Sequence, residues 1–179
     1  DPGHYGDEFG HTTSTCAGKC LAGYLCPAGS STPTHTPCGS PAQYCPVGSF
    51  ASVPVQPGWY SIGGAETTRS SEAMASKGYF TTGGLLQMCP GGTHGAIDGL
   101  ASPKCSGTCR KGYYCPPGSI SDTQRACGGA HLICPTGSLA PQQVTNGFYT
   151  ATYPTSPIEE QCPPGMYRDW SGSAAIDPT

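Results

Sequence analysis

Cysteine is the residue with the most chemical potential in this sequence, and it occurs 12 times in 179 residues. The spacing Cys-x3-Cys-x5-Cys occurs twice, as CAGKCLAGYLC starting at Cys16 and as CSGTCRKGYYC starting at Cys105. Two such thiolates could form half of a zinc site, but the companion Cys-x2-Cys or His-x3–5-His pair is missing. An even number of regularly spaced cysteines favours disulfides formed in an oxidising compartment. We therefore expect no bound metal and a disulfide at every cysteine: Cys16, Cys20, Cys26, Cys38, Cys45, Cys89, Cys105, Cys109, Cys115, Cys127, Cys134 and Cys162.

The other polar residues show no pattern typical of an active site. None of the histidines recurs at the matching position 89 residues away; they are His4, His11, His35, His94 and His131. A Cys–His nucleophilic pair needs a free thiol, and the even cysteine count leaves none. The acidic residues are scattered and lack the spacing of an EF-hand loop, so a calcium site in a loop is the weaker alternative. We therefore expect a protein that is not an enzyme, with no catalytic residues and no cofactor.

The composition indicates a chain held together by disulfides rather than by one large apolar core. It contains 27 Gly and 19 Pro, and charged residues are 11% of it. The net charge is −3 without a basic run, which argues against a nucleic-acid partner. No apolar stretch approaches the ~18 residues of a membrane span. The sequence starts in a Gly-rich loop pattern without a signal peptide, and we interpret it as a mature product or a piece of a longer chain.

The two Cys-x3-Cys-x5-Cys segments belong to an internal repeat. When Cys16–Ser61 is aligned with Cys105–Thr150 without a gap, 20 of 46 positions are identical, and five of them are cysteines. The other identities are mostly Gly, Pro, Ser and Tyr, which are turn formers and one aromatic residue per strand. No Asp, Glu, His, Lys or Arg recurs at an aligned position. This is the pattern of a scaffold.

The repeat predicts two six-cysteine modules. The first copy has about 16 residues more than the second before its last cysteine, and its PGWYSIGG is echoed by KGYFTTGG, which predicts an added strand or hairpin. Six cysteines allow 15 pairings within a module, and the sequence does not choose among them. The expected organisation is an opening loop of an incomplete repeat at 1–15, module 1 at 16–89, a linker at 90–104, module 2 at 105–162, and a segment at 163–179 that leads to a next repeat or subunit.

Short strands separated by turns are expected throughout. The segments around QPGW and TNGF read as tight turns between strands, and residues 65–78 form the only passable helical turn, stopped by Gly78. Three aromatic pairs fall on the expected strands. Strand alternation would point one ring of each pair inward and leave the other for contacts with a neighbouring module or subunit. These predicted assembly contacts are Trp59, Tyr60, Tyr79, Phe80, Phe148 and Tyr149.

Ser-Pro and Thr-Pro pairs are candidates for O-glycosylation. The richest stretch is SSTPTHTPCGSP, and no Asn-x-Ser/Thr sequon occurs. The alternative is that these segments are plain extended loops. The candidate attachment sites are Thr32, Thr34, Thr36, Ser40, Ser102 and Ser156.

The pattern CxxGYYCPxGS…C…YCPxGS…V…GYY…CPPG resembles the ephrin-receptor-like, or growth-factor-receptor-like, cysteine-rich repeat. The resemblance covers 16–89 and 105–162 and is nearest to tandem arrays in large surface proteins of algae, oomycetes and other protists. It implies a small disulfide-rich, mostly β fold: two tandem modules of short strands and loops, with little helix and an elongated form. It also implies an extracellular or cell-surface location and no catalytic residues.

Two functions fit these expectations. The first is a structural extracellular protein, the repeat unit of a filament, stalk or cell-surface appendage that self-associates into a homopolymer or tandem array and carries glycans. The second is a ligand-binding or adhesion ectodomain of a cell-surface receptor, with 46–88 as the binding segment.

Overall fold

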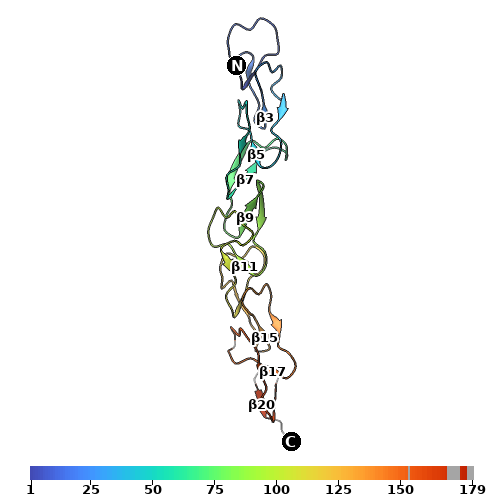
Figure 1. Cartoon of the computed structure of the whole chain (residues 1–179), viewed down its shortest axis with the longest axis vertical. Helices are drawn as coiled ribbons and strands as arrows, with labels where there is room; N and C mark the ends of the chain where they lie inside the picture. Colours follow the sequence, from blue (N-terminus) through green and yellow to red (C-terminus); the bar gives the residue numbers. More distant parts are fainter. Residues whose placement is uncertain (153, 169–173, 177–179) are drawn as a thin grey trace. The chain divides into compact units, whose positions relative to one another are not determined.

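The computed structural model describes residues 1–152, 154–168 and 174–176. These residues form 20 strands of two to four residues and no helix (Figure 1). The strands pair in chain order as β1 (His4–Tyr5) with β2 (Gly18–Lys19), β3 (Tyr24–Leu25) with β4 (Thr36–Pro37), β5 (Gln43–Tyr44) with β6 (Val53–Pro54), β7 (Trp59–Ile62) with β8 (Ser71–Met74), β9 (Tyr79–Thr82) with β10 (Leu85–Met88), β11 (Thr93–His94) with β12 (Gly107–Thr108), β13 (Tyr113–Tyr114) with β14 (Arg125–Ala126), β15 (Leu132–Ile133) with β16 (Gln142–Gln143), β17 (Phe148–Tyr149) with β18 (Glu160–Gln161), and β19 (Met166–Arg168) with β20 (Ala174–Ile176). The disulfide-rich, mostly β fold expected from the sequence is therefore confirmed.

One design recurs in the first nine hairpins. The residue directly after the second strand donates its backbone N–H to the carbonyl of the residue directly before the first strand, as Cys109 does to Gly92 at 2.8 Å. We call this donor the closing residue. Glycine with positive φ usually precedes the first strand, for example Gly92 at +84°, because the tight turn there requires that conformation. The closing residues are Cys20, Cys38, Val55, Ala75, Cys89, Cys109, Cys127, Val144 and Cys162.

Consecutive hairpins are joined by a second recurring hydrogen bond. The N–H of the residue before a first strand donates to the carbonyl of the residue that follows the first strand of the next hairpin. Gly92 donates in this way to Cys115 at 2.8 Å, and Gly112 donates to Cys134 at 2.7 Å. Strands of two residues cannot satisfy their backbone groups alone, so each hairpin depends on the one beside it.

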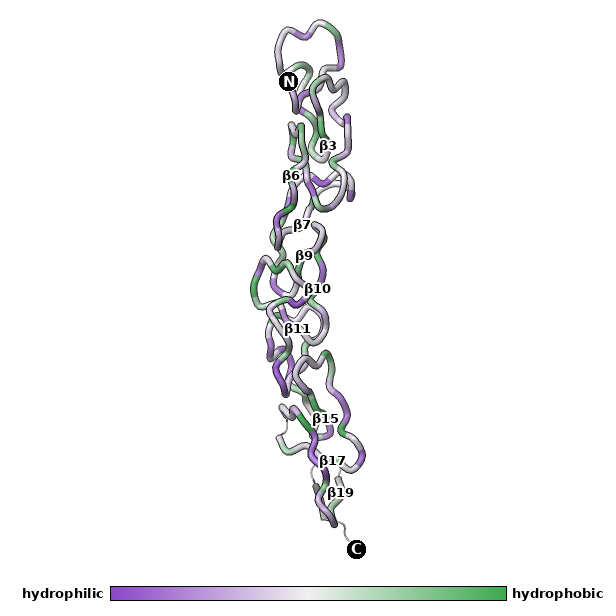
Figure 2. Tube along the Cα trace, in the orientation of Figure 1, coloured by the Kyte–Doolittle hydropathy of each residue, from purple (hydrophilic) through white to green (hydrophobic). Residues whose placement is uncertain are grey.

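Disulfides follow the same geometry and form most of the core. Four bridges join a closing cysteine to the cysteine that follows the first strand of the next hairpin. Apart from cystine, the buried apolar side chains are few, and Figure 2 shows hydrophobic residues in short separate stretches. Cystine thus replaces the aliphatic core that this chain lacks. The four bridges are Cys20–Cys26, Cys38–Cys45, Cys109–Cys115 and Cys127–Cys134.

The fifth disulfide corrects the expectation that each six-cysteine module closes its own bridges. Cys89 bonds to Cys105, the first cysteine of the other expected module. The residue that follows the first strand of the next hairpin is Gly95, which offers no thiol. The partner therefore comes from the β11–β12 loop. Cys16 and Cys162, which we expected in disulfides, have free thiols.

The chain forms two compact units. The first contains Asp1–Ala75 and Thr81–Gln87, and the second contains Ser76–Phe80 and Met88–Thr179. Strands β9 and β10 contribute residues to both. They contain the KGYFTTGG echo, so the added hairpin expected before Cys89 is confirmed.

The helical turn expected at 65–78 is wrong. Strand β8 occupies Ser71–Met74 and pairs antiparallel with β7, with Trp59 opposite Met74 and Ile62 opposite Ser71. A single helical turn is costly to nucleate, whereas pairing with β7 satisfies the backbone at once. Gly78 does not end a helix but precedes β9 with a φ of +81°.

Candidate functional sites: free thiols, exposed side chains and tyrosine–carboxylate pairs

Cys16 has the backbone of a disulfide half-site. It and Cys105 are the two described non-glycine residues with positive φ, at 49° and 51°. The N–H of Cys16 donates to Thr13 at 3.1 Å, and that of Cys105 donates to Ser102 at 2.9 Å. The sequence repeat of 89 residues therefore extends to local geometry. Only Cys105 is bonded, while the half-buried Cys16 directs its Sγ toward the Ser14 carbonyl at 3.7 Å.

Cys162 is the other free thiol and is a closing residue. Its N–H donates to the Gly147 carbonyl at 2.9 Å, as the N–H of Cys89 does to Gly78 at 2.8 Å. Neither free thiol belongs to a metal site, because the described residues contain no group of three or more His, Cys, Asp or Glu able to hold an ion. The chemistry open to each of these thiols is disulfide formation.

The histidines make local contacts, and only His11 is shown near a free thiol, since a Cβ on Gly6 would lie 3.2 Å from its ring and 3.5 Å from Cys16 Cβ. His11 is 3.6 Å from the Asp7 carboxylate, and His35 contacts the Thr36 hydroxyl at 3.0 Å. The Nδ1 atoms of His4 and His94 are buried without a protein hydrogen-bond partner. These histidines are local loop and strand residues.

The aromatic pairs are less exposed than expected. Phe80 is buried, at 5% exposure, whereas Trp59, Tyr60, Tyr79, Phe148 and Tyr149 are all half-buried. A buried and a less buried ring therefore alternate only in the Tyr79–Phe80 pair. The described structure leaves none of these rings fully free for a partner.

Sequence reasoning missed several highly exposed apolar side chains. Phe9 is fully exposed, and Phe50 and Leu139 are 64% and 61% exposed. Phe50 and Leu139 are 89 residues apart, and each follows a Pro-x-Gly-Ser turn, in CPVGSF and CPTGSL. The recurrence of a large apolar residue after this turn was the signal that could have identified them.

Carboxylates brace equivalent turns. A Glu72 oxygen accepts from the Gln56 N–H at 3.1 Å, and Glu159 accepts from the Thr145 N–H at 2.6 Å. Tyr44 Oη also donates to Glu72 at 3.4 Å. Desolvation, followed by the charge of Glu72 and this hydrogen bond, raises the pKa of Tyr44. These acids have structural partners rather than a catalytic arrangement.

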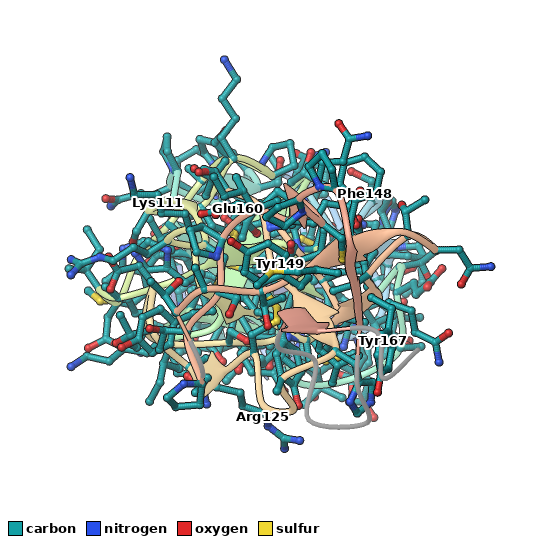
Figure 3. All side chains as sticks on the ribbon, turned by 90° about the horizontal axis from the view of Figure 1, so that it is seen from below. Lys111, Arg125, Phe148, Tyr149, Glu160 and Tyr167 are labelled. Atoms are coloured by element: carbon teal, nitrogen blue, oxygen red, sulfur yellow. A yellow bond between two sulfur atoms is a disulfide. The ribbon has the colours of Figure 1, made fainter. Side chains whose placement is uncertain are left out.

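Tyr149 donates a hydrogen bond to Glu160 on the paired strand at 3.0 Å (Figure 3). This bond and the Glu160 charge raise the pKa of Tyr149 above its usual value. Because the folded-state pKa is the higher one, the contribution of this pair to stability is present below the unfolded pKa of about 10 and is lost as pH rises through the folded pKa. We expect Glu160→Gln to lower the pKa of Tyr149, measured by NMR titration of its ring. Glu159→Gln should leave it unchanged, and equal titrations of wild type and Glu160→Gln would contradict the assignment.

Five of the candidate glycosylation residues are accessible. Thr32, Thr34, Thr36, Ser40 and Ser102 are exposed. The sixth candidate, Ser156, is buried with 1% exposure. The candidacy of Ser156 is therefore withdrawn, because its hydroxyl cannot accept a sugar in the folded chain.

The part of the chain that the structure describes contains no helix able to cross a membrane. Comparison with models of known protein families gives no match, and a search of curated proteins finds no significant relative.

Proposed function

We propose that this chain is a structural extracellular protein, the repeat unit of a filament, stalk or cell-surface appendage. The observation that carries the proposal is the use of the repeated residues. The side chains most deeply buried are cystines, and the repeated glycines and closing residues hold one hairpin on the next. Linear arrays are stabilised by such nearest-neighbour contacts. The likeness to ephrin-receptor-like repeats supports the same proposal.

Electron microscopy of the native, non-reduced protein at several dilutions tests this function. Polymers with a regular axial repeat are the expected result. Particles that stay monomeric at every dilution would contradict it.

The proposal includes attached glycans on the Thr-Pro-rich loop. Peptide mapping of the native protein by mass spectrometry should find O-linked sugar between Thr32 and Ser40, where four candidate hydroxyls are exposed. The peptide that contains Ser156 should carry none at that residue. An unmodified 32–40 segment would identify it as a plain extended loop.

A ligand-binding or adhesion ectodomain is the second candidate. Its support is the group of exposed apolar side chains in segment 46–88, which includes Val47, Phe50 and Met74. Such side chains mark interaction sites when they gather. A monomeric protein that retains a specific partner, and loses it in Phe50→Ser, would favour this function.

A further inference from the structure

The β1–β2 and β11–β12 hairpins are equivalent in the 89-residue repeat, and their contacts within the described residues differ. The β11–β12 hairpin and the loop that follows β13 each make one backbone hydrogen bond to the preceding hairpin, β9–β10. Gly78 N–H donates to the Gly95 carbonyl at 2.9 Å, and Gly118 N–H donates to the Cys89 carbonyl at 2.9 Å. The disulfide Cys89–Cys105 completes this contact. All these residues belong to the second unit.

The β1–β2 hairpin and the loop that follows β3 carry the equivalent groups without a partner among the described residues. Gly6, Gly29 and Cys16 lie 89 residues before Gly95, Gly118 and Cys105. Within the described residues, no hydrogen bond reaches the Gly6 carbonyl, none is made by the Gly29 N–H, and the Cys16 thiol is free. We call these three groups the open face.

The open face already has the conformation of the occupied one. Gly6 N–H donates to Ser30 at 2.9 Å, as Gly95 N–H donates to Ser119 at 2.8 Å. Ala17 N–H donates to Tyr5 at 2.9 Å, as Ser106 N–H donates to His94 at 2.8 Å. A face that is preformed in this way needs little reorganisation to bind its partner.

Two differences between the open face and the occupied face indicate what the open face can bind. At the occupied face, a Cβ on Gly95 would lie 2.8 Å from Gly78 N and 2.9 Å from Cys89 Sγ, so only glycine permits the contact. Gly6 has no such neighbour, and its φ is not positive. Phe9, fully exposed, stands where Asp98 accepts a hydrogen bond from Lys77 N–H. Gly6 is thus a glycine that the isolated hairpin does not need.

We propose that the open face binds a β-hairpin that ends on a cysteine, of the same design as Gly78–Cys89, and that Cys16 forms a disulfide with that cysteine. The incoming hairpin donates one N–H to Gly6, accepts one from Gly29, and packs apolar side chains on Phe9. Its closing cysteine lies beside Gly6, as Cys89 lies beside Gly95. This inference rests on the proposed function, because it specifies the joint of the array.

The covalent step is thiol–disulfide exchange. The Cys16 thiolate attacks the partner cysteine held in a mixed disulfide with a small thiol. The Cys16–partner bond forms, the mixed disulfide breaks, and the small thiol leaves as a thiolate. The oxidising equivalent comes from that low-molecular-weight disulfide.

A synthetic peptide of residues Ser76–Cys89 is the probe, with its cysteine activated as an aromatic mixed disulfide. The full chain is incubated with this peptide or with a scrambled peptide that also ends in activated cysteine, and mass spectrometry follows Cys16 and Cys162. Because two backbone hydrogen bonds hold the native sequence in place, it should label Cys16 about tenfold faster than the scrambled one. Both peptides should label Cys162 at one rate. Equal labelling of Cys16 by both peptides would overturn the proposal.

Gly6→Ala is the decisive variant, with Gly18→Ala as its control. A Cβ at Gly18 would meet the Tyr5 ring at 3.5 Å, an ordinary contact, and one at Gly6 would meet only the His11 side chain at 3.2 Å and Cys16 Cβ at 3.5 Å. Both variants should fold, as amide NMR spectra would verify. Only Gly6→Ala should lose the preference for the native peptide. A preference that survives Gly6→Ala would refute docking at this face.

The joint and the function fail separately. Capture of the peptide without polymers at any dilution keeps the inference and removes the proposed function. If Cys16→Ser polymerises as well as the wild type and the wild type does not capture the peptide, the proposed function stands and the inference fails. In assembled material, a bond from Cys16 to a hairpin-closing cysteine, including Cys162 of a second copy, supports the joint, whereas a Cys16–Cys16 bond overturns it.

Discussion

Reduction of the five disulfides is expected to unfold the described parts of both units. Nine of the ten bonded cysteines are among the buried side chains with at most 4% exposure, together with very few aliphatic residues. A bridge stabilises a fold by about 2–4 kcal/mol. Five bridges therefore contribute about 10–20 kcal/mol, which is as large as the whole stability of an ordinary domain. Addition of a phosphine reductant, followed by NMR amide dispersion and near-ultraviolet circular dichroism, measures the result.

Matched cysteine variants localise this effect. Replacement of both Cys127 and Cys134 by Ala removes one bridge across a sequence separation of 7 residues. We expect a loss of about 2 kcal/mol in guanidinium unfolding, because a short loop constrains the unfolded chain least. The Cys16→Ser/Cys162→Ser variant should unfold like the wild type, since neither thiol is bonded. If the reduced protein kept native amide dispersion, the aliphatic and backbone contacts would be enough to maintain the fold without the disulfides.

Gly23→Ala is expected to cost about 3 kcal/mol of the free energy of unfolding. Gly23 has a φ of +86°, a conformation that costs an L-residue about 1–2 kcal/mol. A Cβ there would also lie against the carbonyl oxygen of Thr68, closer than a real carbon atom can approach. Relief of that clash would break the 2.7 Å hydrogen bond from Gly23 N–H to Cys45, which is worth about 1 kcal/mol. Guanidinium unfolding followed by circular dichroism measures the change.

Two further glycines separate the clash from the backbone strain. Gly112 is equivalent to Gly23 and lies against Thr155 in the same way, so Gly112→Ala should show the same loss. Gly147 also precedes a first strand and has a φ of +85°, but no atom of the described residues lies within 4 Å of its Cβ position. Gly147→Ala should therefore cost only about 1–2 kcal/mol. Equal losses at Gly23 and Gly147 would show that the Thr68 contact contributes nothing.

The sequence by itself determined the fold class and the repeat. Twelve cysteines, abundant Gly and Pro and few charges leave no route to a large core, so a disulfide-rich fold of short strands was predictable. The 89-residue period was visible because the repeated residues are those that turns and bridges require. It also located the hairpin that is added before Cys89, since KGYFTTGG echoes PGWYSIGG.

Only the tertiary structure decided which cysteines pair and which groups stay open. Pairing depends on the distance between thiols in neighbouring hairpins, and Cys89 bonds to Cys105 because Gly95 stands where the nearest thiol would be. The burial of Ser156 and the strand at Ser71–Met74 arise in the same way, from contacts with segments that are distant in the sequence. The open face at Gly6, Gly29 and Cys16 is recognised only by comparison with the equivalent residues 89 positions later, which have partners. Local composition determines the strands and turns, whereas the adjacent hairpin determines which thiols and backbone groups of a hairpin are bonded.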